Sequence, residues 1–184
     1  MRRIPFSQLY TLKDFAQRSR LSRDVIQRWG NVGVLIAEEH SVHGGRGIHR
    51  RFRLPELVIA IFLRPFATLD VPTGQLLRMA GSIRRALLEI QPGSVRGIHY
   101  APGEFELHRA LERGTLGQGD NYLVIGLTEG EIPFDVLEGD VDDELLLARL
   151  GRSVARFLRT VVPRPEAVVV IDLAILRGVL DQTT

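Results

Sequence analysis

Two helix patterns in residues 10–35 lie so close together that only a tight turn fits between them. The apolar residues of each pattern share one helical face: Leu12, Phe15 and Ala16 in the first, and Val25, Ile26 and Trp29 in the second. Thr11 and Ser22 precede the two patterns, and both are good N-caps because a side-chain oxygen accepts a hydrogen bond from a free backbone N–H. We therefore expect a short helix, a turn plugged by Leu21, and a second helix that stops at Gly33.

The basic loop, residues 38–52, follows the second helix and is rich in glycine and arginine. Its glycines between residues 44 and 47 let the tip adopt positive φ angles. Its arginines would then project towards a nucleic-acid backbone or a minor groove, and its end at Arg51 and Phe52 is expected to be extended. Two small helices and a basic loop are the parts of a winged helix-turn-helix, a domain that reads a DNA groove.

The second helix, taken as residues 22–30, has a polar face that suits a DNA major groove. The candidate DNA contacts are Ser22, Arg23, Asp24, Gln27 and Arg28 on this helix, and Arg46, Arg50 and Arg51 on the basic loop. Arginine binds phosphates and guanine edges, glutamine reads adenine, and aspartate accepts from the cytosine amine. The alternative for the helix alone is an amphipathic helix with a solvated face. The paired helices together with the basic loop favour DNA binding.

Charge is divided unevenly along the chain. Residues 1–100 hold 16 Arg or Lys and 7 Asp or Glu, whereas residues 101–184 hold 8 and 15. A basic half followed by an acidic half predicts a nucleic-acid-binding module joined to a part that does not touch nucleic acid. Only Lys13 among the 24 basic residues is a lysine. This preference suits phosphate recognition, or reflects a G+C-rich coding bias.

Composition excludes several classes of protein. The sequence has no apolar run of the roughly 18 residues that a membrane-spanning helix needs, and no charged-then-apolar leader. It also has no cysteine, which excludes disulfides, thiolate metal sites and cysteine nucleophiles. We therefore expect a cytoplasmic protein of one or two small domains that does not bind a membrane.

Two longer helices are predicted after the basic loop. The first covers residues 57–69 and should kink or break near residue 64, because Pro65 lies inside it. The second covers residues 73–90. Its apolar seam is formed by Leu76, Ala80, Ile83, Leu87 and Ile90. This seam is too short to hold a dimer by itself, so we expect it to pack in the core.

Several short stretches match the DNA-binding domain of one protein family. They are residues 10–16, Leu21-Ser22, Trp29, Gly33-Val34-Leu35, Arg50-Arg51-Phe52, Glu56-Leu57 and residues 69–72. They correspond to the family's Tyr-Thr-Ile-x-Glu-Leu-Ala opening, the flanks of its recognition helix, the end of its wing and the next two helix starts. On these matches residues 10–88, under half of the chain, resemble the MerR family of winged helix-turn-helix transcriptional regulators. The resemblance implies DNA binding through the helix 22–30 and the wing 38–52.

The sequence departs from the family pattern at several points. Gln27 and Arg28 stand where the family often has Arg and Tyr, and Arg20 replaces the glycine of the turn. The long antiparallel dimer helix is missing, because Pro92-Gly93 stops the chain. The cysteines of the metal-sensing members are absent. The resemblance therefore implies DNA binding, but neither metal sensing nor the usual dimer.

The rest of the chain predicts a second domain. We expect a DNA-binding domain over residues 1–90, a linker over 91–104 and a small α/β dimerisation or effector domain over 105–184. Apolar patterns predict strands over 121–128, 134–137 and 167–171, and helices over 142–161 and 173–180. Strand, helix and strand in this order favour a right-handed crossover. The fold class is thus mixed α and β.

Neither a metal site nor a catalytic site is expected. Three groups of residues contain side chains that could bind a metal ion or take part in catalysis: His40, His43 and His49; His99, Glu104, Glu106 and His108; and Asp140, Asp142, Asp143 and Glu144. The first group lacks cysteine partners, and the second lies in a polar segment where such side chains are usually solvated. The third lacks the spacing of a calcium loop and suits the start of a helix. We therefore expect no cofactor and no enzyme activity.

Together these features predict a sequence-specific transcriptional regulator that binds double-stranded DNA. A homodimer is expected because two half-sites supply the affinity that one small domain lacks. The C-terminal domain would dimerise or bind a small-molecule or protein effector. The alternative is an architectural or chromosome-organising DNA binder with little sequence preference. A protein-interaction module is a further alternative, favoured by Asp24 and by the small net charge of +2.

Overall fold

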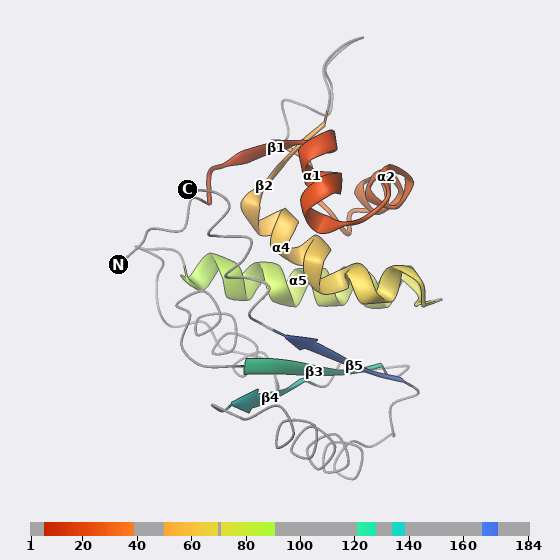
Figure 1. The fold of residues 1–184 in the computed structure, drawn as a ribbon, viewed down its shortest axis with the longest axis vertical. Coiled ribbons are helices and arrows are strands. Elements are labelled where there is room, and N and C mark those ends of the chain that lie inside the picture. The colour runs from red at the N-terminus through yellow and green to blue at the C-terminus, as the bar shows by residue number, and fades with distance from the viewer. Residues whose placement is uncertain are drawn as a thin grey trace. The chain divides into compact units, whose positions relative to one another are not determined.

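The computed structural model of this chain describes residues 6–38, 50–69, 71–90, 121–127, 134–138 and 167–172 (Figure 1). The chain divides into two compact units, Met1–Gln91 and Pro92–Gln182. The described part of the first unit combines helices with two short strands, and that of the second is an antiparallel sheet. The mixed helix-and-strand class predicted from the sequence is confirmed.

The N-terminal unit contains all the described helices. In chain order its elements are β1 (Leu9–Thr11), α1 (Leu12–Ser19), α2 (Arg23–Asn31), β2 (Arg51–Arg53), α4 (Leu54–Leu63), the 3-10 helix η1 (Arg64–Ala67) and α5 (Thr73–Ile90). The helix predicted over 73–90 is confirmed, and so is the break near residue 64, where η1 replaces α4. α4 begins at Leu54 rather than at residue 57, because Pro55 fits the first helical turn, where its missing N–H breaks no hydrogen bond.

Side-chain caps fix the starts of α1 and α2, as predicted. Thr11 Oγ1 accepts from the Asp14 N–H at 3.2 Å, and Ser22 Oγ accepts from the Val25 N–H at 3.3 Å. Shortly after α2, Gly33 has a φ of 82°, a left-handed conformation that favours glycine. The predicted stop at this glycine is therefore confirmed.

A small antiparallel sheet closes the base of the basic loop. β1 pairs with β2 so that Tyr10 lies opposite Phe52, and Ala37 bridges to Phe52 on the other edge. The Glu38 N–H donates to the Arg51 carbonyl at 2.8 Å. The extended conformation predicted at the end of the loop is confirmed. The sequence does not predict β1, because three residues are too few to show a period.

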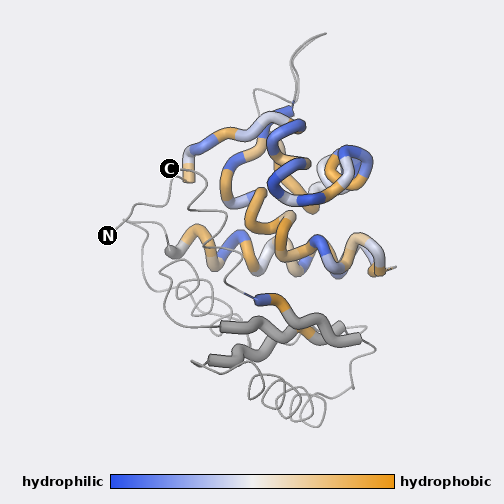
Figure 2. Tube along the Cα trace, in the orientation of Figure 1, coloured by the Kyte–Doolittle hydropathy of each residue, from blue (hydrophilic) through white to orange (hydrophobic). Residues whose placement is uncertain are grey.

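The core of the N-terminal unit forms around α4. Every residue of this helix except Pro55 is buried, and Figure 2 shows it as apolar along most of its length. α4 contacts α1, β2 and α5, and the Phe15 and Phe52 rings have centroids 4.6 Å apart. Buried side chains of other elements include Leu21, Ile26, Trp29, Leu76, Met79, Ala80, Ile83 and Leu87. Four of the five residues of the seam predicted on the last helix, Leu76, Ala80, Ile83 and Leu87, are thus part of the core.

A buried ion pair joins α4 to α5. The Glu56 carboxylate accepts from Arg84 Nε at 2.7 Å and from Arg84 Nη2 at 2.8 Å, a bidentate geometry. The same carboxylate accepts from the Ile36 N–H at 2.9 Å, and Arg84 Nη2 donates to the Val34 carbonyl at 3.1 Å. The pair therefore holds two helices and the segment that leads into the basic loop.

The C-terminal unit contains a three-stranded antiparallel sheet in the order β4-β3-β5. The strands are β3 (Asn121–Leu127), β4 (Phe134–Glu138) and β5 (Ala167–Asp172), each within one residue of its predicted end. β4 and β5 both run opposite to β3, so they are parallel to each other and a crossover connects them. Ile125 and Ile171 are buried, and the strand register places them on one face of the sheet.

Other predictions fall on residues outside the described part. These are the tip of the basic loop, the helices over 142–161 and 173–180, and with them the handedness of the crossover. The domain limits of 1–90, 91–104 and 105–184 stay predictions. Among the described helices, none combines the length and the apolar character needed to cross a membrane.

Glu56→Ala is expected to lower the free energy of unfolding by about 3 kcal/mol, because Arg84 would keep a largely buried charge without its carboxylate. The two paired side chains are only 7% and 21% exposed. Glu38→Ala is the matched control, since Glu38 pairs at 2.6 Å with an arginine that is 53% exposed, and such pairs contribute little. Urea unfolding followed by circular dichroism measures both. Equal losses in the two variants would contradict a special role for the buried pair.

Tyr10→Phe is expected to raise the free energy of unfolding by about 1 kcal/mol, because the Tyr10 hydroxyl is buried without a hydrogen-bond partner.

Burial raises the pKa of Tyr10 above its ordinary value of 10.0, and the charge of Arg18 opposes this shift. Tyrosine therefore ionises first in the unfolded chain, and its contribution to stability is lost as the pH rises above 10. The variant should lose less stability than the wild type between neutral and strongly alkaline pH. Thermal unfolding at both pH values tests this, and parallel losses would count against it.

Candidate functional site

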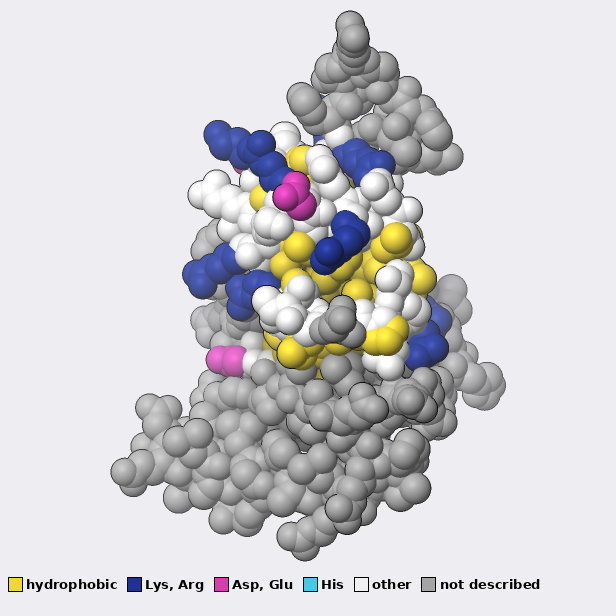
Figure 3. Space-filling model, turned by 90° about the vertical axis from the view of Figure 1, so that its right-hand side faces the viewer, with side chains coloured by type: hydrophobic (Ala, Val, Ile, Leu, Met, Phe, Trp, Pro, Cys, Tyr) yellow, Lys and Arg dark blue, Asp and Glu magenta, His cyan; other side chains and the backbone are white. Residues whose placement is uncertain are grey.

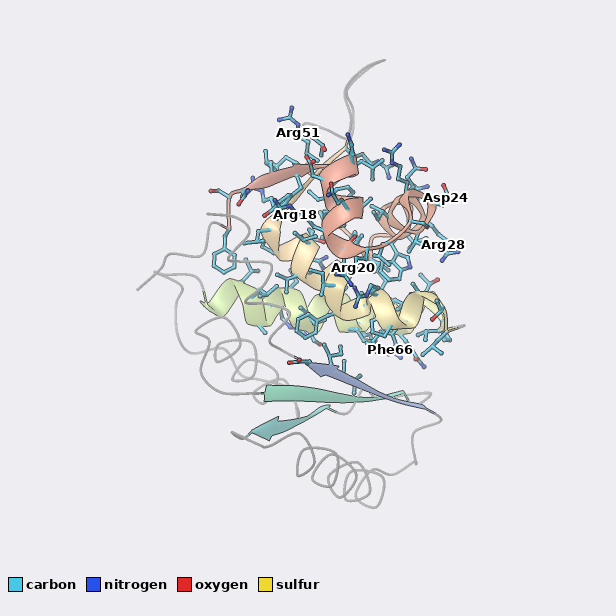
Figure 4. All side chains as sticks on the ribbon, viewed as in Figure 1. Arg18, Arg20, Asp24, Arg28, Arg51 and Phe66 are labelled. Atoms are coloured by element: carbon cyan, nitrogen blue, oxygen red, sulfur yellow. The ribbon has the colours of Figure 1, made fainter. Side chains whose placement is uncertain are left out.

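α2 presents the candidate site on the side that faces away from the core. Ile26 and Trp29 are buried, whereas all five predicted contacts on this segment are exposed: Ser22, Arg23, Asp24, Gln27 and Arg28. At 100° per residue, the four that follow the Ser22 cap occupy a sector of about 140° of the helix. Figure 4 shows Asp24 and Arg28 on the outer side of α2. The buried and polar faces therefore divide as the sequence pattern predicts.

The exposed face of α2 carries unneutralised positive charge. Within the described part of the chain, neither Arg23 nor Arg28 forms a salt bridge or a hydrogen bond through its side chain. Asp24 lies in the first turn, where a carboxylate is stabilised by the helix dipole. Figure 3 shows Lys and Arg side chains around this face, with an acidic side chain between them and a hydrophobic area beside them. The face can attract an anion while retaining one acceptor group.

The predicted contacts of the basic loop lie in different places. Arg50 is half-buried, and its Nη1 atom lies 3.1 Å from the position that a Cβ atom would occupy on Gly30 of α2. Arg51 is exposed at the start of β2, and Figure 4 shows it well separated from Asp24 and Arg28. Arg46 lies outside the described residues. The structure therefore brings Arg50 to α2 but does not bring Arg51 there.

Backbone hydrogen bonds and the buried ion pair set the distance between α2 and the basic loop. The Leu35 N–H donates to the Trp29 carbonyl at 3.2 Å, which ties the end of α2 to the following segment. Glu56 and Arg84 then hold the backbone of Ile36 and Val34. These contacts anchor the segment between α2 and the base of the basic loop.

The turn between α1 and α2 holds a strained residue. Arg20 has φ 56° and ψ 27°, and it is the one non-glycine residue with positive φ in the described part of the chain. An L-residue is crowded in this conformation. Ser19 supports the turn, because its Oγ donates to the Phe15 carbonyl at 2.7 Å and accepts from the Leu21 N–H at 3.3 Å. The turn therefore keeps its left-handed conformation although residue 20 is an arginine and not a glycine.

Sequence reasoning misses three residues that shape this site: Glu56, Arg84 and Gly30. One signal was present for Glu56, which is the only charged residue in the apolar run 54–63 and therefore needs a partner if that run is buried. No comparable signal marks Arg84 among many arginines. Gly30 affects the site only through its contact with Arg50, and the helical pattern of the sequence does not reveal that contact.

Within the described ranges, no group of three or more His, Cys, Asp or Glu side chains is placed to hold a metal ion. The three groups of such residues considered from the sequence lie outside those ranges. Comparison with known proteins finds no protein-family model that matches this chain and no curated protein with significant similarity to it.

Arg20→Gly is expected to raise the free energy of unfolding by about 1 kcal/mol, because glycine adopts the left-handed conformation without crowding. Gly33→Ala is the opposite control, since it introduces a side chain at a φ of 82° and should lower stability. Thermal unfolding of both variants against the wild type measures the changes. A less stable Arg20→Gly protein would show that the arginine side chain contributes more than the turn conformation costs.

Proposed function

We propose that this chain is a DNA-binding transcriptional regulator with a MerR-like winged helix-turn-helix in its N-terminal unit. In this proposal α2 is the recognition helix and lies in the major groove, while the basic loop is the wing on the flanking backbone. The observation that carries it is the pair of exposed arginines on α2, Arg23 and Arg28, which have no partner within the described part and lie on the same helix that Arg50 approaches.

The side chains on α2 suit base reading as well as phosphate binding. A helix of about 10 to 12 Å diameter fits a major groove that is about 12 Å wide. Arg23 and Arg28 can bind phosphates or guanine, and Gln27 can pair with adenine. Asp24 is repelled by phosphates but can accept from a cytosine amine. A carboxylate at this position lowers non-specific affinity, so it favours a sequence-specific regulator over an architectural binder.

The proposal includes double-stranded DNA as the partner, a homodimer as the active form and no enzymatic step. One domain with so few base contacts gains affinity and specificity from a second half-site. The acidic C-terminal half is repelled by DNA, which suits a role in dimerisation or in binding a small-molecule or protein effector.

A protein-interaction module is the second candidate function. Val32, Leu69 and Leu77 are 42%, 43% and 40% exposed, and Figure 3 shows a hydrophobic area on the face that carries α2. Contiguous exposed apolar surface often marks a protein contact. This candidate differs from the first because its binding would not depend on the phosphate backbone.

Selection of bound duplexes from a random DNA pool, followed by sequencing, tests the first function. An enriched inverted repeat is expected, because each protomer of a dimer would read one half-site. Retention without enrichment would favour the architectural binder. No retention even at low salt would rule out DNA binding and favour the protein-interaction module.

Arg28→Ala is expected to weaken binding to the selected duplex and to reduce the salt dependence of binding by about one unit if this side chain contacts a phosphate. Arg85→Ala is the control, because it removes the same charge from an exposed position on α5. Fluorescence anisotropy at several salt concentrations measures both. Equal losses in the two variants would show that only the overall charge matters and that α2 is not the contact surface.

A further inference from the structure

Gly30 occupies an unusual position for a glycine in α2. It is the next-to-last residue of the helix, and the positive φ of this region belongs to Gly33, so no backbone strain requires glycine at residue 30. Glycine is a poor helix former, and almost any other residue would favour helix formation more. An explanation must therefore come from what lies next to it.

The guanidinium of Arg50 lies next to it. A Cβ atom on Gly30 would come within 3.1 Å of Arg50 Nη1, closer than most such contacts in proteins. By contrast, a Cβ atom on Gly74 or Gly81, both in α5, would meet nothing within 4 Å. Among these helical glycines, Gly30 is the one whose missing side chain leaves space for another residue.

The same position brings Arg50 to the side of α2 that also carries Arg23 and Gln27. Gly30 follows Arg23 by two helical turns and Gln27 by three residues, so all three lie on one side of the helix. Within the described residues Arg50 makes no salt bridge or hydrogen bond through its side chain, and neither does Arg23. Two unpaired guanidinium groups on one side of a helix, about two turns apart, can each bind a phosphate of a DNA backbone that follows that side.

We propose that Gly30 is the positioning residue for Arg50: its bare backbone supports the guanidinium on the side of α2 that carries Arg23, so that the wing and the recognition helix bind the same DNA backbone. This inference rests on the proposed DNA-binding function and adds that the wing contact is set from α2 rather than from the loop itself. Gly30 itself touches no DNA in this arrangement.

Gly30→Leu tests the proposal, because leucine favours the helix but fills the space under the guanidinium. The full-length protein is titrated with mixed-sequence duplex DNA at several salt concentrations, since phosphate contacts do not depend on sequence. Gly30→Leu and Arg50→Ala should each weaken binding by about tenfold and reduce the salt slope by about one. The double variant should bind no more weakly than Arg50→Ala alone, because Gly30 acts only through Arg50.

Gly81→Leu is the matched control, since it adds the same side chain to open space on another helix and should leave DNA binding unchanged. Gly30→Ala displaces the guanidinium less, and it should give a smaller loss in the same direction if the leucine variant fails to fold. A Gly30→Leu protein that binds as the wild type would overturn the inference and leave the DNA-binding function standing. Losses that add in the double variant would overturn it too, because leucine would then obstruct DNA directly. A wild type that binds no DNA would overturn both.

Discussion

Glu56 and Arg84 face each other inside the N-terminal unit, one on α4 and the other on α5, and both reach the backbone that leads into the basic loop. Moving two charges out of water is costly, and only good geometry with further hydrogen bonds offsets that cost. Here a bidentate pair and bonds to Ile36 and Val34 use both carboxylate oxygens and two guanidinium nitrogens. The ion pair consequently holds α4, α5 and the segment that leads into the basic loop together.

The candidate site depends on this arrangement because its parts come from segments far apart in the chain. α2 follows a turn in which Arg20 has a left-handed conformation, and the Glu56 pair holds the segment that leads into the loop. Arg50 then crosses from the loop to Gly30 of α2. The fold thus contains two locally unfavourable features, a strained turn before α2 and a glycine within α2, and the glycine lies at the proposed DNA surface.

Local sequence signals predicted much of the fold. Cap residues, apolar spacing and Pro65 gave the ends of α1, α2 and α5 and the break after α4, because each effect acts within one helical turn. Prediction failed for β1, which is too short to show a pattern, and for the start of α4, where Pro55 lies inside the first turn rather than before it. The candidate contacts on α2 followed from the same helical period, whereas the separation of Arg50 from Arg51 did not.

The sequence by itself determined where α1, α2, α5 and the three strands of the C-terminal unit lie, and which face of α2 is polar. These properties depend on residues within about four positions of each other, and such local relations can be seen in the sequence alone. Only the tertiary structure decided that Glu56 pairs with Arg84, that Arg50 rests on Gly30, and that Arg51 lies apart from α2. The Glu56–Arg84 and Arg50–Gly30 contacts join residues twenty or more positions apart, and such contacts form only when the whole core has packed.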